Sequence, residues 1–411
     1  MMRPTLVLLA LLVSGPFLGL SASAAEPEPL DPRLFPVPQE LSANVAFWKL
    51  VYSKFDDDKV LVHDNRHLDI IYTVIDLSDV ADQSETRQRL VKRKRIEAQK
   101  TLFRRVLSDL AAGRSRDGFE AQEERVASLF ADIPGGPAKY RAAMDRIRHQ
   151  TCLRNQFAEA VERSGLYMET FEETFARRGL PTELARLPFV ESMFRNEARS
   201  KAAASGLFQF MASTARSYLT MSAETDERHD PFRAADAAAR LLARNHERLG
   251  TWPLALTAYN HGANGMARAV RKLGTRDIGT ISRDYRSRTF GFASRNFYSE
   301  FVAAASVYHH RERHFPGFTP MAPLSWDEFV ADHYVATPTL AREAGIELAD
   351  LRQLNPGLSR EIWSGDLYLP KQYTLRVPRG STADFQTAYA GLSADDKLDH
   401  QTGLRYRVRR G

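Results

Sequence analysis

The sequence predicts a mainly α-helical protein, with a few short strands in its N-terminal part and a small α/β module near its C-terminus. Apolar residues recur at helical spacing over most of the 411 residues, between breakers such as Pro134, Gly179 and Gly250. Residues 59–63 and 69–77 are β-branched and alternate in polarity, as half-buried strands do, and shorter strand-like segments occur at 334–335 and 366–369. The chain is long enough for two or three domains, and 43% hydrophobic residues is an ordinary globular composition.

The N-terminal residues have the pattern of a secretory signal. Residues 1–24 begin with Arg3, continue through a short apolar run and close with small residues, which predicts cleavage after Ala24. A Ser-Gly-Pro interruption leaves this run too short to span a membrane. Residues 25–40 are rich in proline and predict an extended leader, with order beginning near Leu41.

Charge and cysteine content limit the possible partners. A net charge of +6 on an exported protein favours an anionic cell envelope over nucleic acid. The single cysteine, Cys152, excludes an internal disulfide and is expected to be a buried small hydrophobe in a helix. His309, His310 and His314 lack a third ligand at suitable spacing, so no metal site and no cofactor are predicted.

The region at 41–164 is expected to be mostly helical. An aromatic amphipathic helix ends at the acidic run 56–58, which is a turn rather than a calcium loop because spaced ligands are missing. Beyond the two strands, the periodicity predicts helices at 84–112, 118–131 and 137–166. Their expected task is to support the domain that follows.

The rest of the chain divides into a helical domain at 165–316, a short α/β module at 324–378 and a polar tail at 379–411. Within the helical domain, Asp230 followed by Pro231 begins a helix that ends at Gly250. Further helices are predicted for residues 252–259 and 294–314.

One acid interrupts an apolar stripe in the helical domain. Steps of four and three residues join five positions, and the fourth of them is Glu191: Leu180, Leu184, Leu187, Glu191 and Phe194. A carboxyl group in such a setting is desolvated, and the raised pKa suits a general acid near neutral pH. The alternative is a structural ion pair of Glu191 with Arg186 or Arg195.

Other polar residues leave two interpretations open. The small residues 200–206 allow backbone to approach a ligand closely. The charged loop 226–230 either borders a cleft or serves capping and ion pairing. Tyr259, Asn260 and Tyr298 are polar tips on apolar helix faces, which either satisfy core hydrogen bonds or line a carbohydrate groove.

Five ordered motifs resemble those of the lytic murein transglycosylases that carry the SLT domain, most closely the D-type membrane-bound branch. They are LPTELARLPFVESMF, the serine at 200, GLFQFM at 206–211, DERHDP at 226–231 and WPLALTAYNHG at 252–262. The resemblance implies a lysozyme-like helical catalytic domain. It also implies cleavage of the β-1,4 bond between N-acetylmuramic acid and N-acetylglucosamine in peptidoglycan.

Site residues follow from the same resemblance. Glu191 would be the one acid/base catalyst, Ser200 and Gln209 would contact the sugar near the reacting centre, and Met211 would line the cleft. The remaining residues would shape the site around the acid: Tyr259, Asn260 and Tyr298.

Two departures from the D-type pattern concern Ala212 and the N-terminus. Ala212 stands where the family often has proline, and the lipid-bearing cysteine of that branch is absent. The expected location is the periplasm, with attachment to the outer membrane left open. The C-terminal module resembles a LysM peptidoglycan-binding domain through GIELADLRQLNP, although residues 336–339 replace the usual Gly-Asp-Thr start.

The resemblance offers one carboxylate where ordinary glycosidases use two. A single acid suffices if the substrate's 2-acetamido group stabilises the cationic centre and the muramyl 6-hydroxyl closes on C1, giving a 1,6-anhydro product. A hydrolytic muramidase would need a second acid, with Asp226 or Glu227 as candidates. In a non-catalytic scaffold that binds the cell wall, Glu191 would be structural only.

Overall fold

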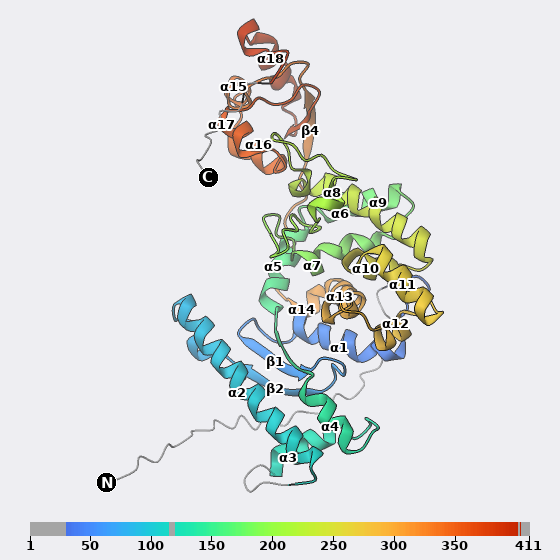
Figure 1. The fold of residues 1–411 in the computed structure, drawn as a ribbon. Helices are drawn as coiled ribbons and strands as arrows, with labels where there is room; N and C mark the ends of the chain where they lie inside the picture. The colour runs from blue at the N-terminus through green and yellow to red at the C-terminus, as the bar shows by residue number, and fades with distance from the viewer. Residues whose placement is uncertain (1–29, 115–119, 402, 404–411) are drawn as a thin grey trace, which may run out of the picture.

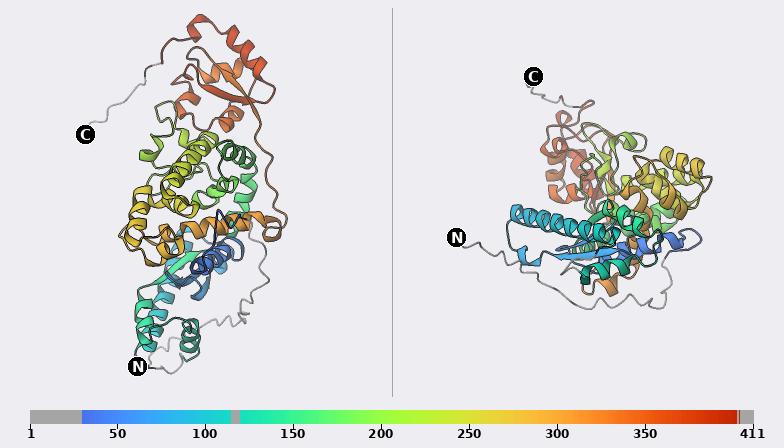
Figure 2. Two further views of the ribbon diagram at one scale, coloured as in Figure 1. Left: turned by 90° about the vertical axis from the view of Figure 1, so that its right-hand side faces the viewer. Right: turned by 60° about the horizontal axis from the view of Figure 1, so that its bottom comes forward.

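The computed structural model describes residues 30–114, 120–401 and 403, which form an elongated molecule of three tiers (Figures 1 and 2). A small sheet with its helices forms one end, a helical domain forms the middle, and the C-terminal module forms the other end. The mainly α fold is confirmed. The predicted signal peptide at 1–24 and the basic run at 405–410 lie outside the described residues.

The first tier contains a three-stranded antiparallel sheet in the order β2-β1-β3. Its elements, with the first helix of the chain, are α1 (Gln39–Ser53), β1 (Lys59–Asp64), β2 (Ile71–Asp76), the 3₁₀ turn η1 (Ser78–Val80), α2 (Glu85–Ala111), α3 (Glu120–Leu129), α4 (Pro137–Met144) and β3 (Ile147–Thr151). The two predicted strands are confirmed as β1 and β2. The sheet and α2 to α4 enclose a core of their own, in which the ring of Tyr72 stacks on that of Phe103 at 5.2 Å.

The helix predicted at 137–166 is wrong, because β3 divides it into α4 and α5 (Arg154–Ser164). Residues 147–151 pair along β1, for example His149 with Val62, and so satisfy backbone groups that a sheet edge would leave open. Cys152 follows this strand and is buried, as predicted, although not in a helix.

The first helix belongs to the core of the middle tier rather than to the sheet. α1 packs along α13 (Phe292–His309), and its aromatic face is buried there. The segment before it is ordered as well: the ring of Phe35 lies 5.9 Å from that of Phe301, and Phe35 is 1% exposed. Order therefore begins before Leu41, and the prediction of a loose leader is wrong for residues 30–38.

The middle tier consists of short helices around one apolar core. They are α5, α6 (Met168–Arg177), η2 (Thr182–Arg186), α7 (Leu187–Glu191), α8 (Ala212–Ala215), η3 (Glu227–His229), α9 (Pro231–Leu249), α10 (Trp252–His261), α11 (Ala263–Leu273), α12 (Ile278–Asp284), α13 and α14 (Arg311–His314). The predicted helix signals hold, because Asp230 caps α9 and Gly250 ends it with a φ of 83°. Across the described residues, every helix is too short or too polar to cross a membrane.

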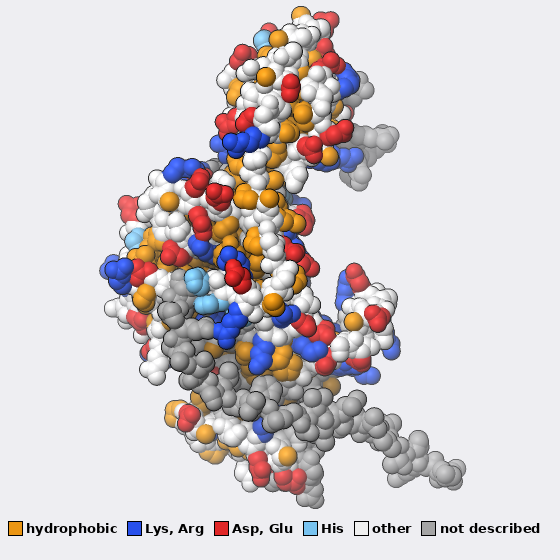
Figure 3. Space-filling view, turned by 180° about the vertical axis from the view of Figure 1, so that it is seen from behind, with side chains coloured by type: hydrophobic (Ala, Val, Ile, Leu, Met, Phe, Trp, Pro, Cys, Tyr) orange, Lys and Arg blue, Asp and Glu red, His pale blue; other side chains and the backbone are white. Residues whose placement is uncertain are grey.

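The C-terminal module is a two-stranded antiparallel sheet covered by helices. It contains β4 (Trp326–Val330), α15 (Thr337–Glu343), α16 (Leu348–Leu354), α17 (Arg360–Ser364), β5 (Thr374–Pro378), α18 (Thr382–Gly391) and η4 (Ala394–Asp396). The small α/β module is thus confirmed, but its predicted end at residue 378 is wrong, because Phe385 of α18 is buried in its core. From behind, hydrophobic side chains gather at the narrow neck below this module (Figure 3).

Candidate active site

Glu191 is the last residue of α7, a helix of five residues that follows the 3₁₀ turn η2. Pro188 has no N–H with which to continue the hydrogen bonding of η2, so the chain restarts as α7. After Glu191, Met193 and Phe194 have φ angles of 51° and 53°, which turn the chain away. The apolar setting is retained, because Phe189 and Phe194 are both buried beside the acid.

The Glu191 carboxyl is partly accessible but poorly solvated. Burial raises its pKa to about 8, and the charge of Glu300 acts in the same direction. The two arginines that could have formed an ion pair with Glu191 have other partners. Arg186 pairs with Glu172 at 2.6 Å, and Arg195 pairs with Glu159 at 3.3 Å. Among the described residues, no hydrogen-bond or ion-pair partner of the Glu191 carboxyl is found.

Glu300 is the candidate that the sequence interpretation missed. It lies on α13, which packs against α7, and burial raises its pKa to about 8, although the Arg148 guanidinium opposes this. The signal that singled out Glu191 was present here too, because Glu300 interrupts the apolar run between Phe297 and Val302. The site therefore holds two carboxyl groups that interact electrostatically.

Four of the sequence motifs meet around residues 207–210. Ser192 Oγ donates to the Leu207 carbonyl at 2.9 Å, and the Tyr259 hydroxyl donates to the Phe208 carbonyl at 2.8 Å. Gly206 has a φ of 79°, and a Cβ atom there would lie 1.7 Å from the carbonyl oxygen of Arg228. Only glycine fits that contact.

Ser200, Gln209 and Met211 occupy the loop after Glu191. Gln209 Nε2 donates to the carbonyls of Ala198 and Gly206 at 3.0 and 2.8 Å, so this side chain holds the loop together. Ser200 Oγ accepts the N–H of Ala204 at 3.0 Å. Ser200 and Met211 are exposed, Met211 by 42%.

Two further predicted residues bind other parts of the chain. Asn260 is exposed, and its Oδ1 accepts a hydrogen bond from Ser294 Oγ at 2.8 Å, which joins α10 to α13. Tyr298 is buried, and its hydroxyl donates to the carbonyl of Pro36 at 2.8 Å. Its contact thus fixes the segment before α1. Tyr259 interacts with the acid electrostatically. Burial raises the pKa of Tyr259, and the charge of Glu191 acts in the same direction.

Backbone strain is concentrated beside the acid. Five non-glycine residues in the described part of the chain have positive φ angles, and all but Gln372 lie within 193–209: Met193, Phe194, Ala203 and Gln209. Such conformations are sparsely populated and cluster at functional sites in proteins.

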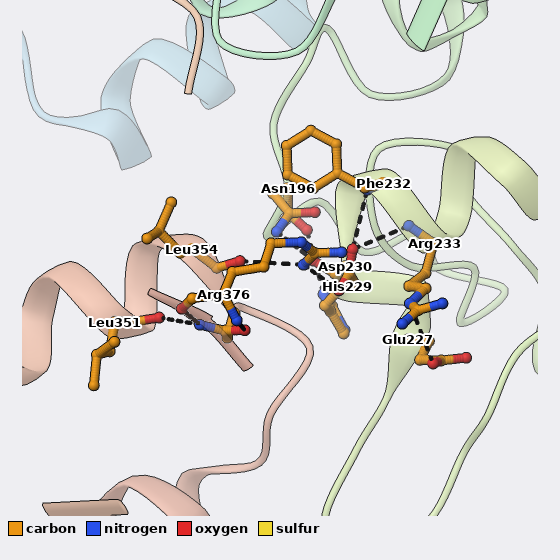
Figure 4. Close-up of polar contacts among 10 residues, drawn as sticks. Asn196, Glu227, His229, Asp230, Phe232, Arg233, Leu351, Leu354 and Arg376 are labelled. Carbon is orange, nitrogen blue, oxygen red and sulfur yellow. Dashed lines mark hydrogen bonds and ion pairs between the residues drawn. The ribbon is translucent and has the colours of Figure 1, made fainter. Parts of the chain in front are cut away.

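The charged loop 226–230 has the structural role that was one of its two interpretations. Arg228 is buried and pairs with Asp226 at 2.7 Å, and Glu227 Oε2 accepts the N–H of Thr220 at 2.6 Å. Asp230 Oδ1 accepts the N–H groups of the first turn of α9, and Asp230 Oδ2 accepts from Arg376 Nη1 at 2.7 Å. Figure 4 shows this last pair, which joins α9 to the C-terminal module.

Aromatic rings surround the same contact. The Arg376 guanidinium lies 4.8 Å from the ring of Phe232 and 5.4 Å from that of Trp326. The two rings are 4.4 Å apart, and Arg376 is 7% exposed. The module is therefore docked on the helical domain through a buried cation.

These features describe a helical domain in which a desolvated, unpaired acid lies beside a strained loop. Residues 169–281 match the family model described as Transglycosylase SLT domain. The predicted resemblance to proteins with an SLT domain is thereby confirmed for this part of the chain.

The chain is also similar to individual proteins. Membrane-bound lytic murein transglycosylase D of Escherichia coli strain K12 is 27% identical over 224 residues, which cover 52% of this chain and 48% of the relative. The chain thus spans about half the length of the curated relatives it matches. The X-ray structure of an inactive mutant of lytic transglycosylase Slt from Pseudomonas aeruginosa is 19% identical, covers 57% of this chain and 35% of that one, and has a TM-score of 0.29.

Proposed function

We propose that this protein is a peptidoglycan lytic transglycosylase. It cleaves the β-1,4 bond between N-acetylmuramic acid and N-acetylglucosamine without water, and Glu191 acts as acid and then as base. The observation that carries the proposal is the unpaired Glu191 carboxyl in an SLT domain, whose pKa of about 8 keeps its proton near neutral pH. A general acid must hold that proton before the reaction begins.

The proposed reaction has two steps. Glu191 first donates its proton to the glycosidic oxygen as the bond to muramic C1 breaks, while the substrate's 2-acetamido group stabilises the cationic centre. The Glu191 carboxylate then removes the proton of the muramyl 6-hydroxyl, whose oxygen closes on C1. A 1,6-anhydro sugar results, and Glu191 regains its proton.

Hydrolysis of the same bond is the competing proposal, and the two acids first considered for it serve other contacts. Asp226 pairs with Arg228, and Glu227 accepts a backbone N–H. Glu300 is the second carboxyl near Glu191, but burial raises its pKa to about 8 and so disfavours the ionised form that a base or nucleophile needs. This favours the reaction with one acid.

The deciding experiment is product analysis. Purified protein is incubated with peptidoglycan sacculi, and the released fragments are identified by mass spectrometry. Anhydromuramyl ends support the proposal, reducing muramic ends would replace it by hydrolysis, and the absence of soluble fragments would favour a scaffold without catalysis.

We further propose that the C-terminal module binds peptidoglycan, as its LysM-like sequence GIELADLRQLNP suggests, and that the protein acts in the periplasm. A docked module would hold the glycan strand near the SLT domain and raise its local concentration. Removal of residues 324–411 should weaken sacculus binding more than it slows turnover of short soluble fragments. The melting temperature is measured on the same preparation, because Arg376 also contacts the SLT domain.

A further inference from the structure

A basic cavity lies between α1 and α12, far along the fold from the motifs around Glu191. Its volume is about 520 Å³, and none of the candidate active-site residues lines it. Five arginines and a single acid, Glu40, are among its lining residues: Arg66, Arg146, Arg283, Arg286 and Arg295. Figure 1 shows α1 and α12 side by side where the first two tiers meet.

Two of these arginines have carboxylate partners. Arg283 pairs with Glu40 at 3.0 Å and with Asp284 at 2.9 Å. Arg146 Nε donates to Asp64 at 2.9 Å, and Asp64 is fully buried. These carboxylates neutralise the charges of Arg146 and Arg283 at the boundary between the first two tiers.

The other three arginines have no such partner in the described part of the chain. Arg295 Nη2 donates to the carbonyl of Asn65 at 3.2 Å, and Arg286 Nη1 donates to the carbonyls of Arg283 and Tyr285. No described carboxylate lies within ion-pair distance of Arg66, Arg286 or Arg295. These three cations therefore lack a direct ion pair, although the carboxylates of Asp64 and Asp284 act on them from a longer distance.

These cations disfavour one another. Burial lowers the pKa of Arg295 to about 10, and the charges of Arg66 and Arg286 act in the same direction. Burial also lowers the pKa of Arg66, again with help from neighbouring guanidinium groups. Like charges held together in a partly buried space are unfavourable unless an anion neutralises them.

Two residues that line this space each have a buried donor without an acceptor. Arg146 Nη2 and Ser282 Oγ are buried, lack a hydrogen-bond partner among the described residues, and belong to residues that line the cavity. A buried donor without an acceptor is destabilising, and most such groups in proteins are satisfied. An oxygen-rich anion would supply charge, and it would supply an acceptor to either donor that turns toward the cavity.

We propose that this cavity is a binding site for an oxyanion ligand, which carries phosphate or carboxylate groups. Guanidinium groups bind both anions through paired, charge-assisted hydrogen bonds, and three of them are available here. The volume is sufficient for a small molecule. Two sources share this chemistry: a free phosphate compound, or the carboxylates of a peptidoglycan peptide stem.

Melting curves of the full chain test the proposal. One series contains sodium pyrophosphate, a second contains a peptide-stem tripeptide released from peptidoglycan, and a third contains sodium chloride at matched ionic strength. A saturable rise in melting temperature is expected with at least one oxyanion and not with chloride. The oxyanion that gives the rise identifies the source.

Variants establish where the ligand binds. Arg286→Gln and Arg295→Gln should each weaken the response at least about tenfold in ligand concentration. Without ligand, their melting temperatures should equal or exceed that of the parent, because a repulsive charge is gone. Arg248→Gln, an exposed arginine at the end of α9, is the matched control and should respond as the parent does.

Two results would overturn the site. Either no oxyanion raises the melting temperature beyond the chloride series, or both cavity variants respond like the parent, in which case water fills the space. Glu191→Gln should keep the full response, because Glu191 does not line the cavity. A loss of catalysis in that variant with retained binding therefore separates this proposal from the proposed function.

Discussion

Asp230 and Glu191 are acids of the same helical domain, yet their surroundings are opposite. Asp230 is 2% exposed and accepts hydrogen bonds from two backbone N–H groups and from Arg376. Glu191 has apolar neighbours, another acid nearby and no such partner in the described residues. The Asp230 carboxylate is therefore surrounded by hydrogen-bond donors, whereas the Glu191 carboxyl has none among the described residues.

The different surroundings of the two carboxyl groups suit a structural role for Asp230 and proton transfer for Glu191. Donors stabilise the charged form of Asp230, which can therefore cap α9 and hold the C-terminal module. Desolvation stabilises the neutral form of Glu191, which leaves a proton available for transfer. Burial alone does not distinguish these roles, whereas the inventory of partners does.

The sharpest test of this contrast removes the proton of Glu191. Glu191→Gln should fold normally and lose activity by about 10²- to 10⁴-fold, because the amide keeps the size of the side chain but cannot act as an acid. A clearing assay on sacculi and a melting curve are measured on one preparation. Glu183→Gln on η2 is the control and should remain active. An active Glu191→Gln protein would remove Glu191 from the mechanism.

The matching test for the paired acid is Asp230→Ala. It should lower the free energy of unfolding by about 3–5 kcal/mol, because Arg376 is left buried without its partner. Urea denaturation measures the effect. Glu85→Gln, which breaks an exposed pair with Arg89, should change stability little. Equal effects of the two substitutions would contradict a structural role for the Asp230 pair.

The raised pKa of Glu191 should also make stability depend on pH. The folded protein holds the Glu191 proton up to about pH 8, while an unfolded chain releases it near 4.5, so stability should fall as pH rises between these values. Glu191→Gln lacks this proton and should show a weaker decline over the same range. Melting temperatures from pH 5 to 8 test this, and parallel curves would contradict a raised pKa.

The smallest expected effect concerns Glu300, whose charge contributes to the raised pKa of Glu191. Glu300→Gln should lower that pKa, so that the alkaline fall in activity begins at lower pH. A purely structural role would instead lower stability and leave the pH profile in place. The profile of kcat/KM is the measurement, with Glu312→Gln on α14 as the control.

Local patterns predicted much of this molecule. The stripe around Glu191 predicted a desolvated carboxyl group, the proline and glycine signals located α9 and α10, and alternation identified β1 and β2. The division of that stripe between η2 and α7 follows from the missing N–H of Pro188, which the spacing of apolar residues alone does not show.

Contacts between distant residues could not be predicted in this way. β3 forms because its residues pair with the edge of β1. The sequence of residues 147–151 alone does not predict a strand. Asp230 and Arg376 are 146 residues apart, so their ion pair needs the folded arrangement of both units. The sequence shows that Glu300 lies among apolar residues. Its proximity to Glu191, however, depends on the packing of α13 on α7.

The positive φ angles between residues 193 and 209 have a consequence for laboratory evolution. Each strained residue costs about 1–3 kcal/mol, so a selection for heat resistance would favour glycine at Ala203, where φ is 63°. The same change would loosen the loop that Gln209 holds beside Glu191. Variants selected for endurance alone should therefore accumulate glycine in this loop and turn over substrate more slowly.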